Sequence, residues 1–101
     1  MKIIRNKIEG NTPINEDTQL HGMIVGSTTV SRNSILQLHG MIIGDLILEE
    51  NSTVYLHGMV NGNIINNGGY LEVFGIVNGK IIRESGKTII DSNAGIRASV
   101  V

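Results

Sequence analysis

Three histidines recur at equal intervals along this chain, at His21, His39 and His57. Histidine is a common metal ligand and the usual general base, so this regular spacing could serve either kind of chemistry. If one interval makes one turn of a coil, the three imidazoles fall in one column, within reach of one metal ion. No carboxylate or cysteine shares that column to complete a metal site. We therefore predict a stacked imidazole ladder that supports the coil, with no metal and no cofactor.

The other residues that could carry chemistry lack the neighbours that catalysis needs. Glu49 and Glu50 are adjacent on a polar turn, whereas a general acid and a general base face the substrate from separate positions in a cleft. None of the serines stands in the G-x-S-x-G context of a nucleophile elbow. The G-x-V-x-G spacing at residues 58–62 belongs to a recurring pattern and no helix is expected after it, so it is not a phosphate-binding loop. We predict that the protein is not an enzyme.

The histidines belong to a repeat that runs through most of the chain. Its clear copies are residues 20–26, 38–44 and 56–62, and a looser copy is residues 73–79. The first glycines of these copies fall at positions 22, 40, 58 and 75, so the steps between them are 18, 18 and 17. We expect the one-residue deletion in the glycine-rich corner at residues 66–69. A fixed period of this size is typical of a solenoid, in which each period forms one turn of a coil.

Within each copy, residues that suit the interior alternate with residues that suit the surface. The copy that begins at Leu56 has Gly58 and Val60 in its inward set, and His57 and Met59 in its outward set. A period of two is the mark of a half-buried strand. The inward columns repeat from turn to turn: Leu20, Leu38, Leu56 and Val73; Ile24, Ile42, Val60 and Val77; Leu46, Ile64 and Ile81.

These patterns predict an all-β fold, a single-domain β-solenoid (β-helix) of about five turns of 17–18 residues, each with three short strands. Helix is excluded by the 13 glycines, because each would cost about 1 kcal/mol in a helix relative to alanine. Residues 1–101 form one domain. Within it we predict a degenerate N-terminal turn at residues 3–17, regular turns at residues 18–96 and a tail at residues 97–101.

Composition argues against several classes of partner. The net charge of −1 and the pI near 6.3 provide no attraction to nucleic acid or to an anionic membrane. No apolar segment approaches the roughly 20 residues of a membrane span. The absence of cysteine fits a reducing compartment, so we expect the protein in the cytoplasm.

The outward residues of the copies form columns of their own. A row of methionines flanked by valine, isoleucine and phenylalanine is an apolar patch of the kind that marks interaction sites, and methionine suits adaptable ones. We predict a surface for a protein partner or for another copy of the chain, made of His21, Met23, Val25, His39, Met41, Ile43, His57, Met59, Phe74 and Ile76. Two alternatives remain open: this face packs under the N-terminal arm, or inward and outward are exchanged there.

The tandem pattern aliphatic-x-Gly-x-Val/Ile-x-Gly-x-Ile, clearest in residues 56–64 and 73–81, resembles the repeat of the bactofilins. The resemblance covers about residues 18–90. It implies a right-handed β-helix that polymerises end to end without a nucleotide, since bactofilins are bacterial cytoskeletal proteins of that kind. Bactofilins usually carry flexible tails, one of which associates with membranes. This sequence has almost no tail, so membrane attachment is not expected.

A left-handed β-helix is the rival for the fold. Aliphatic residues recur every six positions at Ile24, Val30, Leu36, Ile42, Leu48, Val54 and Val60. This resembles the hexapeptide repeat of acyltransferases. The six-residue register fails after Val60, at Asn66 and Glu72, so we favour the right-handed form.

Two functional hypotheses follow from the sequence. The first is a bactofilin-like cytoskeletal subunit that self-assembles through its open coil ends, with the methionine row making lateral contacts. The second is a small protein-binding module, such as an immunity protein that neutralises a toxin. The C-terminal end distinguishes them: if residues 97–101 cover the last turn, growth from that end is blocked and the second hypothesis gains.

Overall fold

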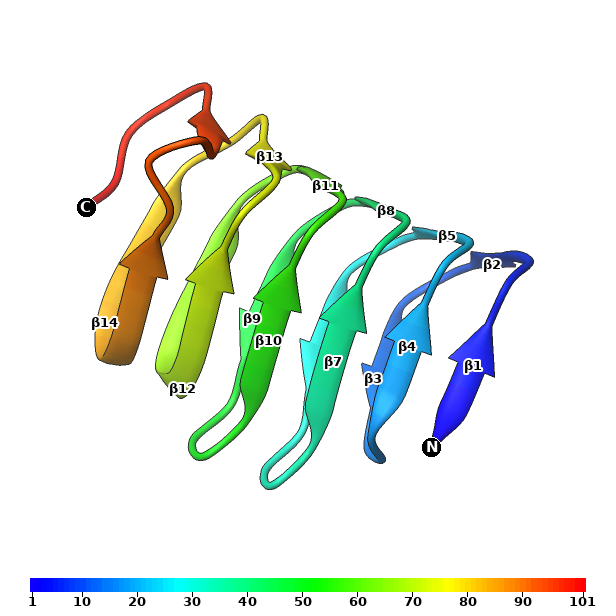
Figure 1. Ribbon diagram of the computed structural model, residues 1–101. Helices are drawn as coiled ribbons and strands as arrows, with labels where there is room; N and C mark the ends of the chain where they lie inside the picture. The colour runs from blue at the N-terminus through cyan, green and yellow to red at the C-terminus, as the bar shows by residue number, and fades with distance from the viewer.

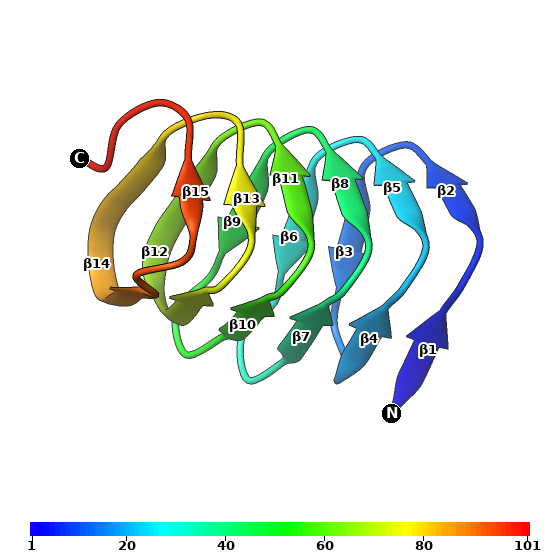
Figure 2. The same ribbon diagram turned by 45° about the horizontal axis from the view of Figure 1, so that its top comes forward.

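Fifteen strands follow one another along the chain, all of them short except β12 and β14, and no helix interrupts them. The computed structural model describes residues 1–101. A typical turn contributes three strands, one to each side of a three-sided coil (Figure 1, Figure 2). The strands are β1 (Lys2–Ile4), β2 (Lys7–Glu9), β3 (Thr12–Ile14), β4 (Thr18–Leu20), β5 (Met23–Val25), β6 (Thr28–Val30), β7 (Ile35–Leu38), β8 (Met41–Ile43), β9 (Leu46–Leu48), β10 (Thr53–Leu56), β11 (Met59–Asn61), β12 (Ile64–Val73), β13 (Ile76–Val77), β14 (Ile81–Ile90) and β15 (Gly95–Ile96).

Strands of successive turns pair in parallel and form two sheets. One sheet has the order β1-β4-β7-β10-β12-β9-β6-β3, with β14 beside β12, and the other has the order β15-β13-β11-β8-β5-β2. The first sheet covers two sides of the coil, because β12 and β14 each run around the corner between those sides. The predicted all-β solenoid is confirmed.

The pairing register confirms the predicted period. One inward column reads Ile4, Leu20, Leu38, Leu56, Val73 and Ile90, so its successive steps are 16, 18, 18, 17 and 17. Asn66 still pairs with Leu48, a full period before it. Tyr70 pairs with Thr53, which is one position short of a full period. The shortening of the step from 18 to 17 therefore arises in the corner at residues 66–69, as predicted.

The interior is a continuous stack of aliphatic side chains. Eighteen buried hydrophobic residues form one cluster along the length of the coil. Ile24, Ile42 and Val60 have 0% of their surface exposed, so the inward assignment of the repeat is confirmed. A single turn cannot bury such side chains alone, so contacts between turns are the main stabilising interaction of this fold.

The first glycine of each copy is required because adjacent turns approach closely at that corner. A Cβ built on Gly40 would overlap the carbonyl oxygen of Gly22 in the turn before, and Gly58 meets Gly40 in the same way. The φ angles of these glycines lie outside the left-handed region, so steric contact alone excludes a side chain. Gly44 differs, because its φ of 141° favours glycine in addition to a similar close approach.

The corner at residues 66–69 is built around the buried side chain of Asn66. Its Nδ2 donates to the carbonyl oxygens of Gly69 (3.2 Å) and Lys87 (3.1 Å), and to Oγ1 of Thr88 (3.2 Å). Its Oδ1 accepts hydrogen bonds from the N–H groups of Gly68 (3.2 Å) and Gly69 (2.8 Å). The side chain thus provides hydrogen-bond partners for four backbone groups of the corner, and β12 continues through it with a register shift.

The coil is right-handed, as the sequence resemblance implied. In Figure 1 the chain rises on the near side in β1, β4 and β7, and passes over the top away from the viewer. It then descends on the far side while it advances from the N-terminus to the C-terminus, and the turned view in Figure 2 agrees with this path. The six-residue period of aliphatic residues occurs in this right-handed coil because its three sides are nearly equal in length.

Candidate interaction surfaces

The strands β2, β5, β8, β11, β13 and β15 form one side of the coil, which we call the methionine face. Successive turns place similar residues side by side in its two outward columns: Met23, Met41, Met59 and Ile76 in one, and Val25, Ile43 and Asn61 in the other. All of these except Asn61 are half-buried, because stacked side chains cover part of one another. The predicted columns are present, and their methionines are more sheltered than an exposed row would be.

The corner that precedes the methionine face carries the predicted imidazole ladder. The ring centroids of His21 and His39 lie 4.9 Å apart and those of His39 and His57 lie 5.1 Å apart, with interplanar angles of 5° and 6°. Phe74 continues the stack at 4.9 Å from His57. All four side chains are exposed. The structure holds no group of three or more His, Cys, Asp or Glu side chains placed to bind a metal ion.

Both alternatives considered for this face are wrong. Ile42 has no exposed surface, whereas its neighbour Met41 is half-buried and faces outward. The inward and outward sets are therefore not exchanged on this face. The N-terminal segment does not cover the face either, because β1 pairs with β4 on another side of the coil. The ten predicted residues therefore lie together on one continuous outer surface.

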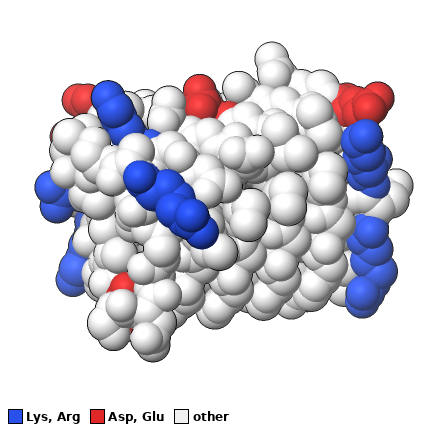
Figure 3. All heavy atoms as spheres, turned by 90° about the horizontal axis from the view of Figure 1, so that it is seen from above, with Lys and Arg blue, Asp and Glu red and all other residues white.

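This surface is uncharged along most of its length. Residues 20–26, 38–44, 56–62 and 73–79 contain no Lys, Arg, Asp or Glu. Figure 3, which looks down from the top of Figure 1, shows a broad area without charge between Lys and Arg side chains that gather toward the two ends. A face of this kind provides contact area without the cost of removing charges from water.

The ends of the coil have unpaired strand edges. At the N-terminal end, β1, β2 and β3 each pair with one strand only. At the C-terminal end, the tail continues the coil along the beginning of β14, where the N–H groups of Ile81 and Arg83 donate to the carbonyl oxygens of Ser99 (2.9 Å) and Val101 (2.8 Å). The rest of β14 and all of β15 have no strand beyond them. Residues 97–101 thus cover part of the last turn and leave most of it open.

The exposed large hydrophobic side chains gather at these same ends. Five of the six lie in the terminal turns or the tail: Met1 (70% exposed), Ile3 (50%), Ile89 (39%), Ile90 (36%) and Val101 (58%). The sixth is Phe74 (37%), at the end of the imidazole ladder. The open ends and Phe74 were predicted from the sequence, but the five exposed residues of the terminal turns and the tail were not. Ile90 belongs to an inward column and is exposed because it lies in the last turn, whereas Ile3 and Ile89 belong to an outward column.

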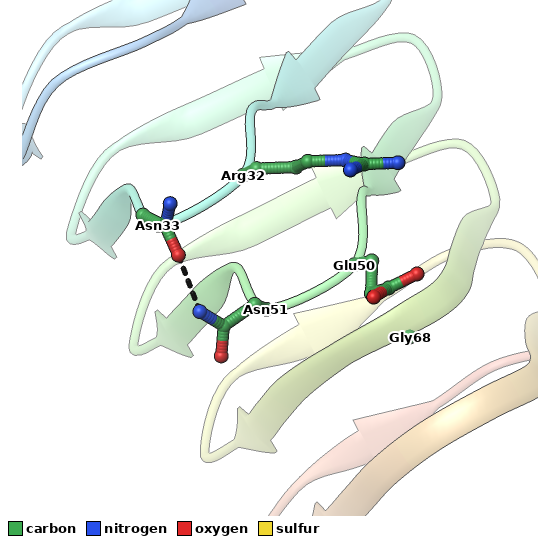
Figure 4. Close-up of a pocket in the computed structure, with 5 residues that line it drawn as sticks. All are labelled: Arg32, Asn33, Glu50, Asn51 and Gly68. Carbon is green, nitrogen blue, oxygen red and sulfur yellow. Dashed lines mark hydrogen bonds between the residues drawn. The ribbon is translucent and has the colours of Figure 1, made fainter.

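The largest hollow lies on the corner between two other sides, and no hydrophobic residue lines it. Arg32, Asn33, Glu50, Asn51 and Gly68 surround a volume of about 390 Å³ (Figure 4). The side chain of Asn51 donates a hydrogen bond to that of Asn33, and both residues have a positive φ. Small-molecule sites are mostly apolar with a few placed polar groups, so this hollow is best described as the space between two corner loops.

Comparison with family models, curated proteins and solved structures found no protein that this chain matches. The chain also has no helix long and apolar enough to cross a membrane.

Proposed function

We propose that this protein is a non-enzymatic structural subunit that self-assembles, similar in role to the bactofilins. The observation that carries the proposal is that unpaired strand edges and exposed large hydrophobic side chains occur together at both ends of the coil. Unpaired edges favour the addition of another strand, and exposed apolar side chains gain free energy when they leave water. A second coil stacked on the end satisfies both requirements at once.

The methionine face supplies lateral contacts in this proposal. Its outward columns repeat with the spacing of the turns, about 4.8 Å, so two coils laid side by side can interdigitate over several turns. Methionine adapts to such contacts because its side chain is flexible. End contacts set the length of an assembly, and lateral contacts set its width.

Light scattering on a sizing column, with negative-stain microscopy of the same fractions, tests the proposal. We expect a high-mass peak that grows with protein concentration, together with filaments. Ile90→Asp places a charge in the open inward column at the C-terminal end and should shift the protein toward the 10.9 kDa monomer. Gln37→Asp, in the middle of the coil on an outward position, is the matched control. A sharp monomer at every concentration of the unaltered protein contradicts the proposal.

The second candidate is a small protein-binding module such as an immunity protein. One observation favours it: the tail pairs with β14 and occupies part of the C-terminal edge. In that case the protein stays monomeric, and Met41→Lys should abolish binding of a protein partner while the fold remains intact.

A further inference from the structure

The two ends of the coil belong to the same columns, so each residue of β1 and β2 has a counterpart in the last turn. The inward column that begins at Ile4 ends at Ile90, and the outward column that begins at Ile3 ends at Ile89. A second copy placed on the C-terminal end in the same orientation would continue the columns that begin in β1 and β2. Ile3 and Ile89, which are 50% and 39% exposed, would then lie side by side.

The imidazole ladder is bounded by opposite charges. Each ladder residue donates its backbone N–H to the carbonyl oxygen of the residue that precedes its column neighbour in the turn before. The N–H of His21 donates in this way to Ile4, and the N–H of Asp91 donates to Val73, which precedes Phe74. Arg5, which follows Ile4, therefore begins the column that Asp91 ends. Head-to-tail stacking places Asp91 of one copy beside Arg5 of the next.

A second pair of opposite charges stands on the methionine face. Glu9 begins the outward column that continues with Val25, Ile43 and Asn61. Arg97 follows Ile96, which is the last residue of the neighbouring inward column, so Arg97 ends the column that Glu9 begins. The carboxylate of Glu9 is exposed and its partner within the chain is Lys7 at 3.2 Å, which leaves it accessible to a guanidinium from another copy.

We propose that copies of this chain stack head to tail, with the last turn of one copy in register with the first turn of the next, and that the pairs Arg5–Asp91 and Glu9–Arg97 fix this polarity. The inference rests on the proposed self-assembly and adds its direction. The partner at each end is a second copy in the same orientation, so the assembly is a continuous coil with two different ends.

The remaining columns bring no two like-charged side chains together. By the same register, Lys2 meets Thr88 and Lys7 meets Gly95. Two N-terminal ends placed against each other would instead bring together two sets of the cations Lys2, Arg5 and Lys7. Like charges across an interface oppose association, so the charge pattern favours the head-to-tail arrangement over the symmetric one.

Lys2 limits the strength of this contact. Its column faces the interior at Thr18 and Leu36, so its ammonium must leave through the corner when the next copy closes over it. Inward-pointing charge at a sheet edge is a known restraint on edge-to-edge pairing. Lys2→Thr, which gives the column the residue found at Thr18, should lower the protein concentration at which the high-mass peak begins.

Disulfide trapping tests the polarity, because the chain has no cysteine of its own. Adjacent strands are about 4.8 Å apart, which lies within the Cα separations that a disulfide spans. The variant with Ile3→Cys and Ile89→Cys together should oxidise to a ladder of covalent multimers. Each single variant should remain monomeric on a denaturing gel. Gln37→Cys, in the middle of the same column, is the matched control and should also remain monomeric.

Each outcome decides the inference. Multimers from the double variant alone support head-to-tail stacking. Covalent dimers from Ile3→Cys or Ile89→Cys alone would show symmetric ends and overturn the polarity while self-assembly stands. If the unaltered protein is monomeric by light scattering and the double variant does not crosslink, self-assembly and the inference fall together.

A charge exchange provides an independent test. Arg5→Asp and Asp91→Arg each put like charges at the head-to-tail junction, and each should weaken association about fivefold, as expected for exposed pairs. An equal mixture of the two variants restores opposite charges at every junction of an alternating assembly, and so should recover the association of the unaltered protein. Arg5→Asp that assembles as well as the unaltered protein would overturn the proposed pairing.

Discussion

Adjacent substitutions on opposite sides of one strand test the physical basis of the fold most directly. Ile42 has no exposed surface and lies between Ile24 and Val60 in the core. Met41, its neighbour in β8, points outward and is half-buried between Met23 and Met59. We therefore expect Ile42→Lys to unfold the coil and Met41→Lys to leave it folded.

The magnitudes follow from burial. Removing the buried isoleucine forfeits about 1.5–3 kcal/mol of transfer free energy. Keeping an introduced lysine neutral inside the core requires a pKa shift of about 3–5 units, which is roughly 4–7 kcal/mol. The sum, about 6–10 kcal/mol, is comparable with the 5–15 kcal/mol expected for the total stability of a domain of this size. Met41→Lys keeps an aliphatic stem over its column neighbours and should cost about 1 kcal/mol or less.

Far-ultraviolet circular dichroism and urea unfolding measure both effects. Ile42→Lys should lose the β-sheet spectrum, whereas Met41→Lys should retain it with a midpoint close to that of the unaltered protein. Ile42→Met, which conserves volume, should cost less than about 1.5 kcal/mol and separates the effect of charge from the effect of shape. Equal losses of stability from the two lysine variants would refute the inward and outward assignment.

Three further predictions concern single interactions. Asn66→Ala removes the acceptor for two N–H groups and the donor to three oxygens, so it should lower stability by about 2–4 kcal/mol in urea unfolding. Asn67→Ala, at an exposed neighbouring position, should change it little. The hydrogen bond from Tyr70 to Glu72 (2.5 Å) and the nearby carboxylate charge raise the pKa of Tyr70 to about 12. The stabilising effect of the neutral phenol should therefore be complete below about pH 10 and lost as the pH rises through 12. Ultraviolet titration of the tyrosines should detect the raised pKa of Tyr70. Glu72→Gln should lower that pKa, because it removes the carboxylate. Gly40→Ala would force two turns apart and should cost about 1–3 kcal/mol, and an unchanged melting temperature would show that the corner can relax.

The sequence was sufficient to predict the coil because a fixed period determines which residues become neighbours. Once Leu20, Leu38 and Leu56 are recognised as one column, parallel pairing and the direction of each side chain follow from the alternation of the strand. The ladder formed by His57 and Phe74 was predictable for the same reason. These predictions depended on no contact beyond the adjacent turn.

The sequence did not reveal the role of Asn66 or the exposed isoleucines of the last turn. In a corner with several asparagines and glycines, Asn66 reads as a polar turn residue. Its burial follows from its place in the inward column of Val30 and Leu48, and the shortened corner that comes after it presents backbone groups to which its side chain can bond. Ile90 was missed because it has the pattern of a regular inward position and is exposed because no complete turn follows it. Ile89 differs, because it lies in the outward column of Gln37 and Tyr55 and is a hydrophobic residue at an outward position.

The same physical rule operates within the coil and at its ends. Each inner turn is stable because the next turn covers its side chains and accepts its backbone hydrogen bonds, and the terminal turns lack that partner on one side. A second copy can provide it without any binding site separate from the fold. Lys2 and Pro13 oppose this at the N-terminal end, since one adds a charge and the other removes an N–H donor. The matching columns favour association of two copies, whereas Lys2 and Pro13 oppose it, so these opposing effects together should set how readily copies associate. The opposite charges of Arg5 and Asp91 should then favour the head-to-tail orientation.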